Sequence, residues 1–136
     1  MSVELLYFTP EEWVKYSEDS HVAVFKEIRR SSLDRITYAL AAIDSKGPIG
    51  YVTCRETDEE SLYWQYGGAL EHRYGVAAYR GFEAFIDQAE KNYKRVTTLV
   101  SNENIKYLHL LMKFGFRVIG LRSFNGEVFL ELLKSF

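Results

Sequence analysis

Two short stretches decide the fold of this chain: HRYGVA at positions 72–77 and NIKYLHLLMKFGF at positions 104–116. The first lies between an expected strand, Ser61–Tyr66, and the best amphipathic helix of the chain, Val76–Tyr93. A strand that leads through glycine into a helix turns backbone N–H groups outward, and the positive end of the helix dipole adds to them. The stretch therefore predicts an anion site, at which Gly75 lets the backbone approach a phosphate.

The second stretch follows an expected strand, Arg95–Val100, which is rich in β-branched residues. It begins with a polar residue, Asn104, continues with an apolar helical face to Phe114, and ends in Gly115, which suits a helix C-terminus. The pattern predicts a short helix over 104–114. Its position after the first stretch makes it informative.

The rest of the chain alternates short strands with helices, which indicates a mixed α/β fold with a mostly antiparallel sheet. Thr9 and Pro10 have the chemistry of a helix start, and Asn125-Gly126 that of a tight hairpin. We expect an acidic loop over 56–60 and a bulge or splay at Gly67-Gly68. Further strands are expected over Glu4–Phe8, Thr37–Ile43, Ile49–Arg55, Val118–Phe124 and Glu127–Leu132, and a further helix through Val22, Phe25 and Ile28, ending near Arg30.

The composition of the chain excludes several classes of function. The 136 residues are 47% hydrophobic, and no repeat or linker interrupts them, so we expect one domain over 1–136. A net charge of −2 leaves no basic excess for nucleic acid, and no apolar run approaches the roughly 20 residues of a membrane span. The single cysteine, Cys54, and an N-terminus without a signal pattern favour the cytoplasm. Histidine and cysteine spacing predicts no metal site, and neither a hydrolase elbow nor a Walker loop is present.

Taken together, the two stretches resemble the GNAT superfamily of N-acetyltransferases. The family binds the pyrophosphate of coenzyme A with a loop of the pattern [Q/R]-x-x-G-x-[G/A], matched here by Gly75 and Ala77, with His72 in place of Gln or Arg. Its later helix, N-x-x-A-x-x-L-Y-x-x-x-G-F, is matched by Asn104, Leu110, Gly115 and Phe116. The element order agrees over nearly the whole chain. The resemblance therefore implies a GNAT-like fold, a mostly antiparallel central sheet flanked by helices.

The resemblance also implies a ligand, acetyl-CoA or coenzyme A, bound as a substrate. Its pyrophosphate is expected against the start of the long helix, and its pantetheine arm between splayed strands. Arg80 is a further cation nearby. The implied cofactor-binding residues are His72, Arg73, Tyr74, Gly75, Val76, Ala77, Ala78 and Asn104.

The catalytic positions depart from the family pattern. The tyrosine that protonates the leaving thiolate in the family falls here on Leu111, which carries no proton to donate. Tyr107, one helical turn earlier, and His109 are the alternative donors on this helix, although Tyr107 also suits a packing role and His109 a solvent-facing one. A base is needed to deprotonate an ammonium, and Glu60 is the carboxylate nearest the position that family members use. Glu60 is equally well a solvated residue of the acidic loop, and Glu71 lies close to the phosphate loop.

Two functional hypotheses follow. The first is an acyl-CoA-dependent N-acyltransferase, with a small-molecule or protein amine as the acceptor. The second is a GNAT-fold protein that has lost catalysis and acts as a protein-interaction or regulatory module, in the manner of phage proteins that target a host protein. Exposed aromatic anchors would serve the second, with Tyr63, Trp64, Tyr66 and Phe124 as candidates. A homodimer is possible under either hypothesis.

Overall fold

The structure is a computed structural model that describes residues 2–20, 35–70 and 73–136. Within these ranges, seven strands form one sheet in the order β1-β2-β3-β4-β5-β7-β6. Neighbouring strands are antiparallel except for β4 and β5, which are parallel. The strands are β1 (Glu4–Phe8), β2 (Tyr38–Asp44), β3 (Gly47–Asp58), β4 (Ser61–Ala69), β5 (Arg95–Ser101), β6 (Arg117–Phe124) and β7 (Glu127–Ser135).

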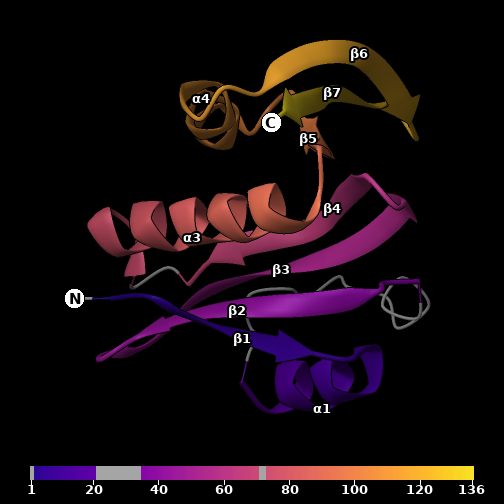
Figure 1. The fold of residues 1–136 in the computed structure, drawn as a ribbon. Helices are drawn as coiled ribbons and strands as arrows, with labels where there is room; N and C mark the ends of the chain where they lie inside the picture. The colour runs from indigo at the N-terminus through magenta and orange to yellow at the C-terminus, as the bar shows by residue number, and fades with distance from the viewer. Residues whose placement is uncertain (1, 21–34, 71–72) are drawn as a thin grey trace.

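Helices cover both faces of this sheet (Figure 1). Helix α1 (Pro10–Ser20) lies on one face, against β1 and β2. Helix α3 (Val76–Asn92) crosses the other face, and α4 (Ile105–Lys113) packs on the same side through Leu108 and Leu111. The mixed architecture with its mostly antiparallel sheet confirms the expected fold class. The helix expected through Val22 to Ile28 lies outside the described residues.

Local sequence signals explain the ends of several elements. Thr9 and Glu12 exchange backbone-to-side-chain hydrogen bonds of 3.1 and 3.3 Å, which is a capping box at the start of α1. At the end of α4, Gly115 has φ +93°, and the N–H of Phe116 donates to the carbonyl of Leu111 at 3.0 Å, as in a Schellman motif. Asn125 and Gly126 both have positive φ and close the β6–β7 hairpin as expected.

Two expectations about local structure were wrong. The acidic segment is not a loop from its start, because β3 continues to Asp58 and leaves only the last two acidic residues in the turn. The extension is held by the N–H of Glu56, which donates to Thr37 Oγ1 at 2.9 Å. Strand β4 is likewise not broken at Gly67-Gly68 and runs on to Ala69, paired with β3.

The irregularity of β4 lies earlier, at Gln65. Thr53 pairs with Tyr66 and Cys54 with Trp64, so Gln65 is an extra residue that β3 does not match. The Thr53 hydroxyl accepts a hydrogen bond from the N–H of Tyr66 at 3.0 Å and holds this bulge. A bulge bends its strand, and it comes where β4 stops pairing with β5.

The parallel pairing of β4 with β5 is short. It covers Ser61–Trp64 against Arg95–Thr98 and then ends, although both strands continue. At the last pair, the Thr98 hydroxyl donates to the carbonyl of Trp64 at 3.1 Å. The expected splay therefore exists and opens beyond Trp64, ahead of the glycines.

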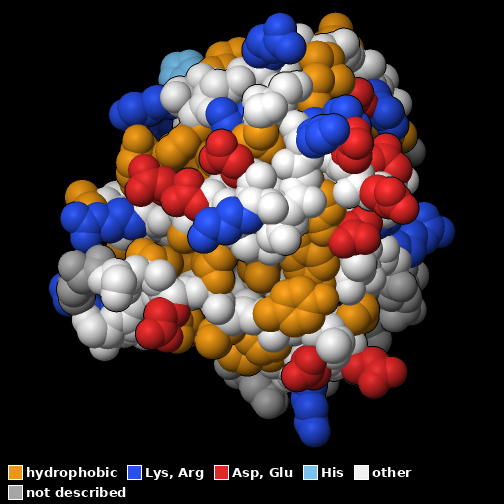
Figure 2. Space-filling view, in the orientation of Figure 1, with side chains coloured by type: hydrophobic (Ala, Val, Ile, Leu, Met, Phe, Trp, Pro, Cys, Tyr) orange, Lys and Arg blue, Asp and Glu red, His pale blue; other side chains and the backbone are white. Residues whose placement is uncertain are grey.

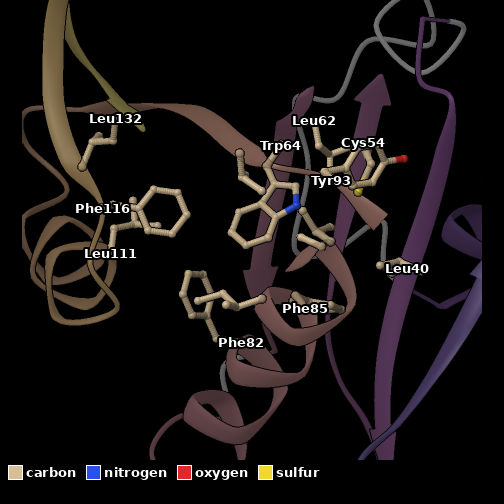
Figure 3. Packing of buried hydrophobic residues seen from close by; sticks show 14 of the residues in the cluster. Leu40, Cys54, Leu62, Trp64, Phe82, Phe85, Tyr93, Leu111, Phe116 and Leu132 are labelled. Carbon is tan, nitrogen blue, oxygen red and sulfur yellow. The ribbon is translucent and has the colours of Figure 1, made fainter. Parts of the chain in front are cut away.

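The main core lies between the sheet and the α3–α4 side (Figure 3), and Trp64 is at its centre. The Trp64 side chain is only 3% exposed. Its ring contacts Phe82 of α3 edge-on, with centroids 5.5 Å apart, and Phe116 after α4 at 5.7 Å. A smaller core on the other face packs Trp13 of α1 against Tyr51. No helix in the described part of the chain is long and apolar enough to span a bilayer.

Substituting Trp64 tests whether this ring joins the two halves of the sheet. We expect Trp64→Ala to lower the free energy of unfolding by about 3–5 kcal/mol, because it leaves a cavity between α3 and the β5–α4 half. Tyr74→Ala, which removes an exposed ring, should stay within about 0.5 kcal/mol of the original protein. Urea denaturation measures both, and equal effects for the two variants would contradict this role of Trp64.

Candidate active site

The start of α3 has the geometry that the sequence predicted for an anion site. Gly75 precedes the helix with φ +104°, a conformation that side chains other than glycine rarely adopt. A Cβ built there would meet no atom within 4 Å, so the space in front of the helix is open. Tyr74 and Val76 are exposed on either side, and Ala77 and Ala78 are half-buried. The first turn of α3 contains no acidic residue that would repel an anion.

A recess of about 250 Å³ adjoins this helix start. Lys46 and Arg80 line it, together with Val76 and Ala77. Arg80 was anticipated from the sequence as a nearby cation. Lys46 was missed, because the β2–β3 turn that carries it is remote in sequence from the loop. Two cations beside a helix N-terminus favour binding of a phosphate group.

Arg73 differs from the expectation in what its side chain contacts. Its guanidinium is buried and donates to the carbonyls of Gly47 and Pro48 at 3.0 Å each, and to the carboxylate of Asp44 at 2.5 Å. Its backbone N–H donates to the carbonyl of Leu70 at 2.8 Å. Arg73 therefore fixes the loop to the β2–β3 turn, and its backbone N–H is already bonded within the protein. His72 and Glu71 lie outside the described residues.

Asn104 lies at the same edge of the sheet as Gly75. The two residues follow the carboxyl ends of β5 and β4, which are parallel neighbours, so their loops emerge at one edge. Asn104 is exposed at the start of α4, and its side chain makes no capping hydrogen bond. Its amide remains available to a ligand.

The structure does not bring the three predicted catalytic residues together. Tyr107 packs against the core and meets Phe82 edge-on at 6.2 Å, and burial raises its pKa. Its hydroxyl has no hydrogen-bond partner among the described residues. His109 is exposed on α4, two residues on and therefore on another side of the helix.

Glu60 is far from the anion site. It lies in the turn before β4 and forms ion pairs with Lys94 at 3.1 Å and Arg95 at 3.6 Å. The loop that leads to Gly75 and α3 follows the other end of β4, a strand of nine residues that spans roughly 30 Å. The geometry gives Glu60 a surface ion-pair role and places no catalytic partner beside it.

A polar cluster that the sequence did not reveal lies on the face opposite α3. Tyr63 pairs with Thr97, and Leu99 pairs with Glu131 of β7, so alternation along the strands turns all four side chains to one face. Leu99 is the first β5 residue beyond the last parallel pair. Glu131 therefore lies level with the opening of the splay, one strand away from it.

Charged groups surround Tyr63 in this cluster. The Arg55 guanidinium lies 5.2 Å from the centre of its ring, and Arg122 of β6 pairs with Glu131 at 2.7 Å. Burial raises the pKa of Tyr63, against the lowering effect of Arg55. The Glu131 side chain is 24% exposed. A clue was present in the sequence: Glu131 is the single charged residue in the otherwise apolar run Val128–Leu133 of the closing strand. Only the strand register shows what it faces.

Solved structures share this fold over nearly the whole chain. An N-acetyltransferase from Staphylococcus aureus Mu50 superimposes with a TM-score of 0.76 and 13% identity, covering 99% of this chain and 98% of the other. Ard1 from Thermoplasma volcanium gives 0.74 and 14%, covering 99% and 98%. A GNAT family acetyltransferase from Elizabethkingia anophelis, solved with acetyl-CoA bound, gives 0.71 and 17%, covering 98% of both chains.

The sequence comparisons add no closer relative. No protein-family model matches the chain, and no curated protein matches it. At identities of this level the likeness establishes the fold: the chain has the fold of the GNAT acetyltransferases.

The buried position of Leu111 gives a prediction about the missing tyrosine. Leu111 is 0% exposed, so Leu111→Tyr would force a larger, polar side chain into the core. We expect it to lower the free energy of unfolding by about 1–3 kcal/mol. Leu110→Tyr, at a half-buried neighbouring position, is the matched control and should lower the free energy of unfolding by less. Thermal denaturation compares the two, and a Leu111→Tyr protein of undiminished stability would contradict this account of the site.

Proposed function

We propose that this protein is an N-acyltransferase that uses acyl-CoA, with acetyl-CoA as the donor, and transfers the acyl group to an amine. The observation that carries the proposal is the splay. Strands β4 and β5 part beyond Trp64 and Thr98, and β4 then leads through Gly75 into the helix start. Two parted strands expose backbone N–H and C=O groups that an extended amide chain such as pantetheine can pair with. The GNAT fold and its acetyl-CoA-bound example from Elizabethkingia anophelis support this use of the splay.

Several residues fit the donor. The N–H groups of Val76, Ala77 and Ala78 belong to the first turn of α3, where a helix leaves its N–H groups without intrahelical partners. The pyrophosphate is placed against them, with Lys46 and Arg80 supplying positive charge. Asn104, at the neighbouring strand end, is placed against the pantetheine arm. His72 and the backbone of Tyr74 complete the loop of the resemblance, and Arg73 holds that loop to the β2–β3 turn.

The acceptor is placed on the opposite face, at the Tyr63–Glu131 cluster. In a direct transfer, the amine nitrogen forms a bond to the thioester carbonyl carbon, the carbon–sulfur bond breaks, and coenzyme A leaves as the thiolate. The attacking nitrogen must lose a proton, and Glu131 is the carboxylate level with the opening. The Arg122 ion pair holds that carboxylate at 2.7 Å, and Tyr63 lies near both charges. We assign the role of base to Glu131 in preference to Glu60.

A second function, protein interaction without catalysis, is favoured by one surface. The β6–β7 hairpin exposes apolar side chains, among them Leu121 at 69% and Phe124 at 50%. Val118 and Ile119 of the same strand are exposed too, and exposed apolar side chains of this kind suit covering by a partner or a second copy. Trp64 does not belong to such a surface, because it is buried in the core. Binding without turnover of acetyl-CoA would indicate this second function, and a cytoplasmic location suits both.

The donor site is tested at Gly75. We expect acetyl-CoA at a hundred times its dissociation constant to stabilise the protein by about 2.7 kcal/mol. Gly75→Glu should abolish this effect, because it puts negative charge where the pyrophosphate binds.

Gly75→Gln is the matched control for that substitution, because it imposes the same backbone strain and nearly the same bulk without the charge. It should retain more of the ligand-induced stabilisation than Gly75→Glu. Thermal shift and calorimetry measure both. Equal ligand binding by the unmodified protein and Gly75→Glu would contradict the placement.

The base is tested at Glu131. With an amine that the enzyme accepts, we expect Glu131→Gln to lower kcat by about a hundredfold at neutral pH while acetyl-CoA still binds, because the variant no longer accepts a proton. Glu127→Gln, an exposed position on the same strand, is the control and should leave kcat unchanged. Equal kcat values for the two variants would remove Glu131 from the mechanism.

A further inference from the structure

A second recess lies at the end of the sheet away from the phosphate loop, where β3 turns into β4 and α3 ends. Its volume is about 320 Å³, within the range of small-ligand sites. In Figure 2, acidic side chains gather along the margin of the molecule over this region, where Figure 1 places the β3–β4 turn. Its lining consists of Tyr7, Thr37, Tyr38, Glu56, Glu59, Gln88, Asn92 and Tyr93.

The charge of this lining is negative. Glu56 and Glu59 both line the recess, and among the described residues no lysine or arginine does. The neighbouring Glu60 is compensated by Lys94 and Arg95, whereas neither Glu56 nor Glu59 has a basic partner among the described residues. The C-terminal end of α3, where the helix dipole is negative, contributes Asn92 to the same wall. The recess therefore favours a cation.

Two buried polar atoms in the wall point to a ligand. Tyr38 is 3% exposed, and its hydroxyl, near the side chains of Tyr93 and Gln88, has no hydrogen-bond partner among the described residues. The Oε1 atom of Gln88 is buried and likewise lacks a hydrogen-bond partner among the described residues. A buried polar group without a partner destabilises the fold, so a protein that keeps such groups usually has a use for them.

The carboxylate of Glu56 is held in place. The Tyr93 hydroxyl donates to it at 2.6 Å, and the Glu56 N–H donates to Thr37 Oγ1 at 2.9 Å. Burial, together with the Glu56 carboxylate, raises the pKa of Tyr93 to about 12, so this hydroxyl keeps its proton and donates at neutral pH. A carboxylate fixed in this way offers its remaining lone pairs to a ligand.

The other walls suit an organic cation. The rings of Tyr7 and Tyr38 stack with centroids 5.1 Å apart, and Tyr7 is exposed on its outer side. An aromatic face attracts alkylammonium groups, and the amides of Gln88 and Asn92 accept hydrogen bonds from N–H donors. We propose that this recess binds an alkylammonium group, with Glu56 and Glu59 as its counter-ions and Tyr38 and Gln88 as its hydrogen-bond partners.

The same ammonium chemistry occurs in free polyamines and in lysine side chains, so the test has two arms. The probes are 1,4-diaminobutane and Nα-acetyl-lysine amide, and the uncharged control is 1,4-butanediol. Calorimetry measures affinity, and amide NMR shifts locate the contact. We expect at least one ammonium probe to bind and to shift the amides of Glu56, Gln88 and Tyr93. The probe that binds more tightly shows whether the recess recognises a free polyamine or a lysine side chain.

Three variants test the assignment. Glu59→Gln changes an exposed side chain outside the core, and Glu56→Gln changes the carboxylate that Tyr93 holds. Each substitution should lower the affinity for the ammonium probe by about tenfold or more. Tyr38→Phe removes the unpartnered hydroxyl, so it should weaken the probe while leaving the stability of the free protein unchanged or raised. Glu83→Gln, an exposed carboxylate of α3 outside the recess, is the matched control and should bind as the original protein does.

Several binding results would contradict the proposed ammonium site. It is wrong if neither ammonium probe binds, if 1,4-butanediol binds as well as the diamine, or if Glu59→Gln and Glu56→Gln bind like Glu83→Gln. The site does not depend on the proposed transferase activity. Gly75→Glu should therefore still bind the ammonium probe even though it no longer binds acetyl-CoA. Loss of binding to both ligands would contradict a separate site.

Discussion

The end of the parallel pairing between β4 and β5 is the constraint on which the rest of this structure depends. The pairing ends at Trp64 and Thr98, where the Thr98 hydroxyl bonds the Trp64 carbonyl. The bulge at Gln65, held by Thr53, then bends β4. The Trp64 ring fills the space beneath the parting strands and joins α3 to the β5–α4 half through Phe82 and Phe116. Strands β4 and β5 part beyond Trp64, and the ring packed at their last pair stabilises the part of the sheet in which they remain paired.

The opening separates two kinds of chemistry. On the α3 side, a glycine with positive φ, a helix start and two cations favour a phosphate-bearing donor. On the opposite face, Tyr63, Glu131 and Arg122 present a fixed carboxylate level with the opening. A donor threaded through the splay would thus meet an acceptor from the other side. The third region, at the Tyr38–Tyr93 end of the sheet, lies at the far end of α3 from Gly75 and on the face opposite Tyr63, and it carries negative charge of its own.

Much of the fold could be predicted from the sequence, because local signals fixed it. The capping box at Thr9, the Gly115 cap and the Asn125-Gly126 turn each act within a few residues, and hydrophobic periodicity marked α3. The positions of Gly75 and Asn104 in the candidate site could also be predicted, since each residue follows one of two neighbouring strands, β4 and β5. The bulge position was not, because Gln65 becomes the extra residue only through the register of β3 against β4. The Tyr63–Glu131 cluster was missed for the same reason: its members lie on strands distant in sequence. Glu60 was expected near the loop because it is close to β4 in sequence, whereas it lies in the turn before the opposite end of that strand.

The central claim, that the splay beyond Trp64 is the acyl-CoA site, is tested most directly by following backbone amide NMR signals during titration with desulfo-coenzyme A. This account predicts the largest shifts at residues 75–78, along 66–69 of β4 and 99–104 at the end of β5. Shifts confined to the β6–β7 hairpin or to the Tyr38–Tyr93 recess, or no shifts at saturating ligand, would contradict it.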